Sequence, residues 1–176
     1  MTHKEISQGN CSLRLVEVQD SRFIVNLRQH EELSRYISST SGDVSKQRVW
    51  ISAYKEREKA GSEYYYIIEN LGTPVGTVRL YDFIGDSFCW GSWVILRGQN
   101  TKIAYSSVVM VYDFAFNELG FKRSHFDVMK GNDSVLRFHM KMGANIVRSD
   151  EANNYLEISL DAYLKVRSRL LRIVNR

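Results

Sequence analysis

The stretch NDSVLRFHMKMGA, residues 132–144, contains the side chain with the clearest potential for chemistry. Val135, Phe138 and Met142 recur at the spacing of an apolar helix face, and a glycine closes the stretch. Residues 135, 139 and 142 share one side of such a helix, so His139 is expected to face the interior. Histidine exchanges a proton near neutral pH. Two interpretations are open: a proton donor at a reaction site, or a core histidine with a hydrogen bond.

The composition is that of an ordinary globular protein. The chain has 176 residues, 44% hydrophobic and 25% charged, which suits one domain with a sizeable core. No apolar run approaches the roughly 20 residues of a membrane span. The first ten residues are polar, so we expect a cytoplasmic protein without a signal peptide or a transmembrane segment. Cys11 and Cys89 have no partner at metal-binding spacing, which predicts free thiols and no metal site.

The net charge of +4 is concentrated at the C-terminal end. Residues 161–176 hold five basic side chains against one acidic side chain, and the rest of the chain is balanced. A nucleic-acid-binding protein more often carries a basic stripe over its body, so no nucleic-acid partner is expected. The pattern predicts a basic helix capped by Asp161, with Leu164, Leu171 and Val174 on its apolar side. Contact of this helix with a membrane surface is the alternative to a solvated basic face.

Hydrophobic periodicity predicts the other elements. In order, these are a strand at 12–18, helices at 20–30 and 45–61, strands at 63–70, 75–82 and 87–96, a helix at 102–119, a strand at 123–129, the helix of the opening stretch, and strands at 144–147 and 154–160. Asp20 and Ser45 are the predicted caps of the first two helices. The strand at 87–96 is apolar on both faces, as in a central strand covered on both sides. The order indicates a mixed sheet in an α+β domain.

Three local features, in this order, resemble the GNAT superfamily of N-acetyltransferases, in its sugar-type or ribosomal-protein-type branch. They are WGSWVIL followed by a polar loop and a helix ending VYDFAFNELGF, the strand HFDV, and NDSVLRFHMKMGA. The resemblance extends from about Leu13 to Leu160. It implies an α/β/α sandwich with a central mixed, mostly antiparallel sheet of six to seven strands, a C-terminal helix, and a single acetyltransferase domain over 1–176.

The resemblance also implies acetyl-CoA as the cofactor. The family's loop Gln/Arg-x-x-Gly-x-Gly/Ala corresponds to QNTKIA, with Lys102 at the position of the usual glycine. Such a loop directs amide groups at a pyrophosphate from a helix N-terminus; the alternative is a polar helix cap. The family's preceding strand splays from its neighbour and bonds the pantetheine arm through its backbone. The implied cofactor-binding residues are Val94, Ile95, Leu96, Gln99, Asn100, Thr101, Lys102, Ile103, Ala104, Asn132 and Phe138.

The implied reaction is direct attack of a primary amine on the acetyl group. His139 stands seven residues after Asn132, where the family often has tyrosine and sometimes histidine near the cofactor thiol, which implies that it protonates the departing thiolate. The family's usual serine three residues after this asparagine is Val135 here. For the base we choose Asp82, with Asp86, Glu69 or a chain of waters as alternatives.

Aromatic residues are frequent in and around the three consecutive strands. Arg79 and Tyr81 share one strand face, and Trp90 lies on the next strand, a combination that suits a sugar nucleotide through stacking and a phosphate contact. Plain core packing is the alternative. We therefore expect an amino sugar or a nucleotide-linked amino sugar as acceptor, and a monomer or homodimer. A protein N-terminal amine as acceptor, or a non-catalytic CoA-binding module, are the alternative functions.

Overall fold

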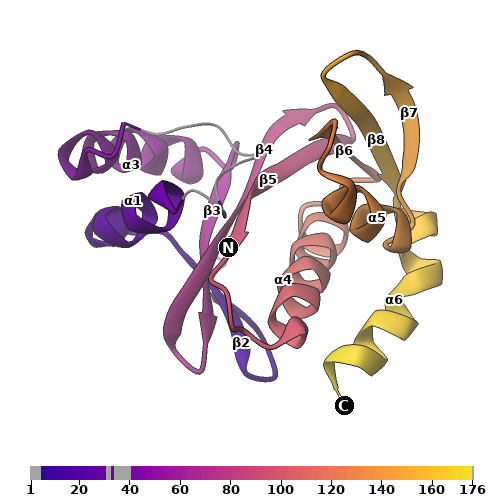
Figure 1. Cartoon of the computed structure of the whole chain (residues 1–176), viewed down its shortest axis with the longest axis horizontal. Coiled ribbons are helices and arrows are strands. Elements are labelled where there is room, and N and C mark those ends of the chain that lie inside the picture. Colours follow the sequence, from indigo (N-terminus) through magenta and orange to yellow (C-terminus); the bar gives the residue numbers. More distant parts are fainter. Residues whose placement is uncertain (1–4, 31–32, 34–40, 176) are drawn as a thin grey trace.

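The computed structural model describes residues 5–30, 33 and 41–175 (Figure 1). The strands are β1 (Glu5–Gln8), β2 (Cys11–Leu15), β3 (Tyr64–Asn70), β4 (Thr73–Ile84), β5 (Ser87–Ile95), β6 (Arg123–Met129), β7 (Asn145–Ser149) and β8 (Asn153–Ser159). The helices are α1 (Ser21–Gln29), α3 (Val44–Lys59), α4 (Thr101–Asp113), α5 (Asp133–Lys141) and α6 (Leu160–Val174), with a 3-10 turn at Val18–Asp20 and a π-helical turn at Phe114–Glu118. The polar segment SSTSGD, residues 38–43, is predicted to be a loop, and residues 38–40 of it lie outside the described residues.

The strands form one mixed sheet in the order β1-β2-β3-β4-β5-β6-β8-β7. Only β5 and β6 run parallel; the other neighbours are antiparallel. The predicted fold class is confirmed, with eight strands instead of six or seven. The sequence pattern does not predict β1, because this short edge strand pairs only with β2 and has no fully buried side chain, so it carries no apolar pattern.

Helices cover both faces of the sheet (Figure 1), and a separate cluster of buried side chains lies on each face. On one face, α1 and α3 pack on alternate residues of β3, such as Tyr65 and Ile67. On the other face, Tyr66 and Ile68 join the larger core beneath α4 and α6. The period-two alternation of strand side chains therefore divides β3 between the two layers.

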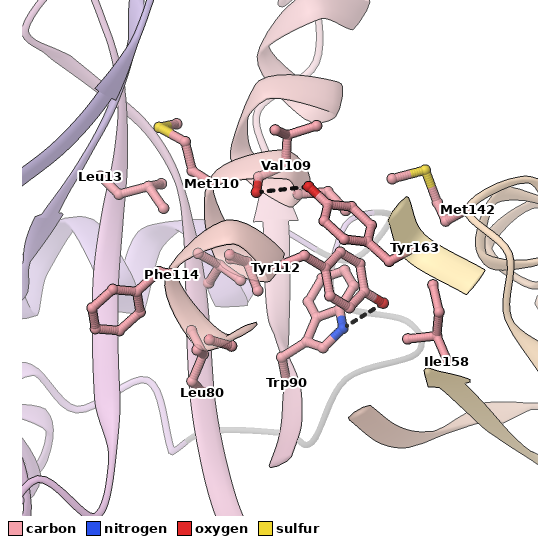
Figure 2. Close-up of a cluster of buried hydrophobic side chains, with 14 of the residues drawn as sticks. Leu13, Leu80, Trp90, Val109, Met110, Tyr112, Phe114, Met142, Ile158 and Tyr163 are labelled. Carbon is pink, nitrogen blue, oxygen red and sulfur yellow. Dashed lines mark hydrogen bonds between the residues drawn. The ribbon is translucent and has the colours of Figure 1, made fainter. Parts of the chain in front are cut away.

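Hydrogen bonds anchor α4 within the larger core (Figure 2). The indole of Trp90 on β5 donates to the hydroxyl of Tyr112 over 3.1 Å. The hydroxyl of Tyr163 on α6 lies 3.3 Å from the Val109 carbonyl and 2.8 Å from the Asp113 carboxylate. Because these polar atoms find partners inside an apolar core, α4 is held in one position relative to β5.

The N-terminal caps of two helices differ from the prediction. Asp43, not Ser45, caps α3: its carboxylate accepts from the Ser45 amide over 2.7 Å. Ser159, not Asp161, caps α6, and its hydroxyl accepts from the Ala162 amide over 3.1 Å. Both segments contain neighbouring cap-forming residues, and sequence alone does not fix which one stands at the turn.

The buried faces of these helices also differ from the apolar patterns in the sequence, which predict Val49, Trp50, Ala53 and Tyr54 on the inner side of the helix at 45–61. In α3, Ile51 and Tyr54 are fully buried, whereas Val49, which the pattern places inward, is 71% exposed. In α6, Tyr163, Leu170 and Val174 are buried, and Leu164 is exposed. The basic helix thus begins at Leu160 and docks through an aromatic residue outside the predicted apolar stripe.

Candidate active site

The two parallel strands of the sheet separate after a short contact. Only Ser87 with Arg123 and Phe88 with Ser124 are in register between β5 and β6. Beyond them, the register of β5 against β4 slips between Thr77 and Arg79, and Ser92 takes a left-handed φ of 47°. A bulge of this kind bends a strand and increases its twist, so β5 leaves β6 and the sheet opens.

A cavity of about 830 Å³ occupies this opening, within the size range of small-molecule sites. It is lined by Trp90 to Ile95 of β5, Phe126 to Met129 of β6, and Asn132, Ser134, Val135 and His139 of the α5 segment, together with Leu33, Tyr81, Cys89 and Ala104. Ala104 belongs to the first turn of α4, and Leu33 lies between α1 and α3. Because α4 and α1 cover opposite faces, the cavity is lined from both sides of the sheet.

His139 is both a core residue and a wall of the cavity. Its side chain is 5% exposed, and its ring centroid lies 4.4 Å from that of Phe126 and 5.2 Å from that of Trp90. The buried Nδ1 atom has no hydrogen-bond partner among the residues that the structure describes. Loss of hydration in these aromatic surroundings lowers the pKa of His139 to about 4. The imidazole is therefore neutral at neutral pH, and the described part of the fold gives its Nδ1 atom no hydrogen bond.

The loop before α4 is partly engaged in its own hydrogen bonds. The Asn100 side-chain oxygen accepts from the Lys102 amide over 2.9 Å, and its carbonyl accepts from the Ile103 amide over 2.9 Å. Asn70 donates to the Gln99 side chain over 3.1 Å. Asn100 is thus the N-cap of α4, and Ala104 is the residue of this loop that lines the cavity. The positive end of the helix dipole lies at this end of the site.

Two of the three implied cofactor-binding residues of β5 and its end line the opening. The Leu96 amide donates to the Val75 carbonyl over 2.8 Å and so faces β4. Because backbone groups alternate along a strand, the amide of Ile95 points the other way, toward the gap. Val94 and Ile95 line the cavity; Leu96 is outside the lining.

The α5 segment contributes Asn132 to the cavity but not Phe138. Asn132 occupies the N-cap position, yet its side chain makes no capping hydrogen bond and lies in the cavity wall. Phe138 packs against Trp93 and Tyr105, with ring centroids 5.0 and 5.5 Å away. It therefore fixes α5 against β5 and α4 from outside the lining.

The three predicted acceptor residues have different surroundings. The Arg79 guanidinium pairs with the buried carboxylate of Glu63 and lies between the rings of Trp50 and Tyr81, 5.1 and 4.7 Å from their centroids. Tyr81 lines the cavity, and burial raises the pKa of its phenol. Trp90 also lines the cavity, although its indole N–H is used by Tyr112.

The structure brings a different carboxylate from the predicted Asp82 into the cavity wall. Asp82 lies outside the lining, 55% exposed, with its carboxylate 3.3 Å from Nε2 of His125. Asp127 lines the cavity and is exposed between the buried Phe126 and Val128. A charged residue that interrupts the apolar strand HFDVM was the signal in the sequence. In the described part of the chain, no cluster of side chains could hold a metal ion, and no helix is both long and apolar enough to cross a bilayer.

Comparison with known proteins places this architecture in a family. The family model of the acetyltransferase (GNAT) domain matches residues 11–145. No curated protein matches the chain. Among solved structures, the chain is similar to FdhC, described as a nucleotide-linked sugar GNAT, with 44% identity, a TM-score of 0.85, and coverage of 94% of this chain and 95% of that chain.

More distant structures share the fold. The ribosomal-protein-S5-alanine acetyltransferase of Vibrio fischeri has 13% identity and a TM-score of 0.76, covering 90% of this chain and 98% of its own. The spermidine N-acetyltransferase of Vibrio cholerae, solved with CoA and spermine, has 17% identity and a TM-score of 0.72, covering 89% and 99%. With a family model that spans most of the chain and a sheet that opens between its two parallel strands, the chain belongs to the GNAT acetyltransferase family and is an acetyl-CoA-dependent N-acetyltransferase.

Proposed function

We propose that this chain transfers the acetyl group of acetyl-CoA to the primary amine of a nucleotide-linked amino sugar, by direct attack. The observation that carries the proposal is the cavity between β5 and β6, lined from both faces of the sheet, in a chain 44% identical to FdhC. One face can receive the acetyl donor while the other admits the amine. A single domain over residues 1–176, a cytoplasmic location, and a monomeric or homodimeric state belong to the same proposal.

The residues around the cavity fit acetyl-CoA, which supplies an acetyl group activated as a thioester. The open edge of β5 at Val94 and Ile95 offers backbone groups to an extended amide-containing arm. The N-terminal turn of α4, within Gln99–Ala104, offers a positive dipole to phosphates. Asn132 has an unused side-chain amide at the cavity wall. We assign the donor side of the site to these groups.

His139 is proposed to donate a hydrogen bond to the leaving sulfur and to help protonate it. Its ring is neutral at neutral pH, because burial holds its pKa near 4. Negative charge that develops on a neighbouring sulfur raises the proton affinity of the imidazole, so the ring can donate a hydrogen bond first and take part in proton delivery as that charge grows. Because Nδ1 is buried, the contact with the sulfur is assigned to the other ring nitrogen, Nε2.

The surroundings of Cys89 favour direct attack of the amine on acetyl-CoA over transfer through an acetylated cysteine. It is the described cysteine in the cavity wall, and therefore the obvious candidate for a covalent carrier. Burial raises the pKa of its thiol to about 11, so the nucleophilic thiolate is scarce at neutral pH.

The charge of the cavity favours an acceptor with one amine. Among the described residues that line it, Asp127 is the only carboxylate. A polyamine carries several positive charges and would leave most of them unpaired there. Tyr81 and Trp90 offer aromatic surface to a sugar, and Arg79 holds the Tyr81 ring by stacking on it. A protein N-terminal amine is the alternative acceptor.

The test separates donor binding from acceptor choice. Acetyl-CoA is expected to raise the melting temperature of the purified protein, since a ligand that binds only the folded state stabilises it by about 2.7 kcal/mol at one hundred times its Kd. Thiol release is then measured with nucleotide-linked amino sugars that differ in amine position, with spermidine, and with a ribosomal N-terminal peptide. Fastest release with a nucleotide-linked sugar supports the proposal, and fastest release with the peptide or spermidine refutes the sugar assignment.

A further inference from the structure

We propose that Asp127 binds the amine of the acceptor and accepts the proton that this amine loses, acting from the face of the sheet opposite to His139. The inference rests on the proposed acetyl transfer and names a residue for it that the sequence pattern did not single out. It depends on three features: the side of the sheet on which Asp127 lies, its lack of a partner among the described residues, and the side chains that lie near it.

The alternation of side chains places the two titratable groups on opposite sides of the opening. Phe126 and Val128 are buried in the core beneath α4, and His139 contacts Phe126 from that side. Asp127 stands between these two strand residues, so its side chain points to the α3 side. Both Asp127 and His139 line the same cavity.

The α3 side of the cavity wall has the features of an amine-binding surface. Tyr81 is paired with Cys89 across β4 and β5, and Arg79 with Gly91, so these four share a face. Arg79 contacts Trp50 of α3, which identifies this face as the α3 side. A Cβ atom on Gly91 would lie 3.0 Å from the Tyr81 hydroxyl, so the absence of a side chain there keeps the surface open.

The carboxylate of Asp127 is exposed to the cavity and is not engaged elsewhere. No hydrogen bond or ion pair between described residues reaches it, whereas Asp82 is paired with His125. Burial is the main cause that raises the pKa values of Tyr81 and Cys89, and the negative charge of Asp127 adds to both, as expected for a carboxylate near these two side chains. An ammonium group or a nitrogen that becomes cationic would supply the missing counter-charge.

The proton balance of the transfer gives Asp127 its role. The amine nitrogen forms a bond to the acetyl carbon while the carbon–sulfur bond breaks. The nitrogen becomes cationic as its new bond forms, and one of its protons passes to the Asp127 carboxylate. The sulfur gains one proton from the His139 side. In total one proton moves from nitrogen to sulfur, through solvent between the two residues, and nothing is oxidised or reduced.

The decisive variant is Asp127→Asn, which keeps the shape and removes the charge. With whichever acceptor of the panel the wild-type enzyme uses, kcat/KM for the amine is expected to fall by about 10²-fold or more. The shift in melting temperature with acetyl-CoA should persist, because the donor side is untouched. Asp127→Glu should recover part of the activity. An acceptor analogue with a hydroxyl in place of the amine should bind the variant and the wild-type enzyme equally.

The control variant lies outside the proposed site. Asp161→Asn removes an exposed carboxylate at the start of α6 and should leave turnover unchanged. Full turnover by Asp127→Asn, or a loss in Asp82→Asn without a loss in Asp127→Asn, overturns the inference while acetyl transfer itself stands. Wild-type enzyme that releases no thiol with any amine refutes the proposed function and this inference together.

Discussion

Replacing His139 by phenylalanine is expected to make the fold more resistant to acid. In the folded protein, burial holds the pKa of this side chain at about 4 instead of the ordinary 6.5. The unfolded chain therefore binds the proton first as the pH falls. The associated stability is complete above pH 6.5 and is lost progressively between pH 6.5 and pH 4, a sign opposite to that of a histidine held by a carboxylate.

The structure sets the magnitude. The lowering of the pKa from 6.5 to about 4 corresponds to a loss of about 3 kcal/mol once the pH is below both values. At pH 5, where the folded ring is mostly neutral and the unfolded ring mostly charged, the loss relative to pH 7.5 is about 2 kcal/mol. Phenylalanine fits the neighbouring rings of Trp90, Phe126 and Phe138 and has no ring nitrogen to protonate.

The assay is urea unfolding of both proteins at pH 7.5 and pH 5.0, read as free energies of unfolding. All carboxylates titrate equally in both proteins, so the difference between the two pH dependences isolates His139. The wild-type protein is expected to lose about 2 kcal/mol more than His139→Phe over this interval. Identical losses would mean that the imidazole is hydrated or partnered in solution, and the argument from its burial would be wrong.

Three other predictions test the proposed mechanism and the packing around it. Cys89→Ala should still turn over. Mass spectrometry of wild-type enzyme mixed with acetyl-CoA should detect no acetylated cysteine, because the thiol is protonated. A stable acetyl adduct that disappears in the variant would refute direct attack. Asp43→Ala should lower the free energy of unfolding by about 1 kcal/mol through loss of the α3 cap, while Ser45→Ala should not; the reverse order would restore the sequence-based cap. Arg79→Met should lower the free energy of unfolding in urea by about 2 kcal/mol, since it removes one of two partners of the buried Glu63. Arg57→Met is the matched variant. No loss in Arg79→Met would show that Arg57 alone satisfies the carboxylate.

Local periodicity was sufficient for the order of the strands and main helices from β2 to α6. Strands such as β6 and β8 alternate between buried and accessible residues, and the helix that begins at Thr101 shows its apolar stripe over several turns. The family motifs were also readable, because each is a short contiguous segment. The errors arose where the signal was weak or duplicated: β1 has no apolar face, and each misplaced cap had a second cap-forming residue close by.

The properties of the site depended on contacts between segments distant in sequence. The helical pattern put His139 on an inner face, but its pKa is set by rings from β5 and β6, far away along the chain. Asp82 and Asp127 look alike in sequence, since each follows an aromatic residue in an apolar strand. Only the separation of β5 from β6 puts one of them in the cavity wall and the other outside it.

The sequence by itself thus determined which segments fold and which family motifs they carry, because both are encoded in neighbouring residues. The tertiary structure decided which side chains share the cavity, which of them are dehydrated, and which have no partner. Those properties follow from the bulge in β5 and the two-sided covering of the sheet. They depend on distances between strands and helices that meet only after the chain has folded.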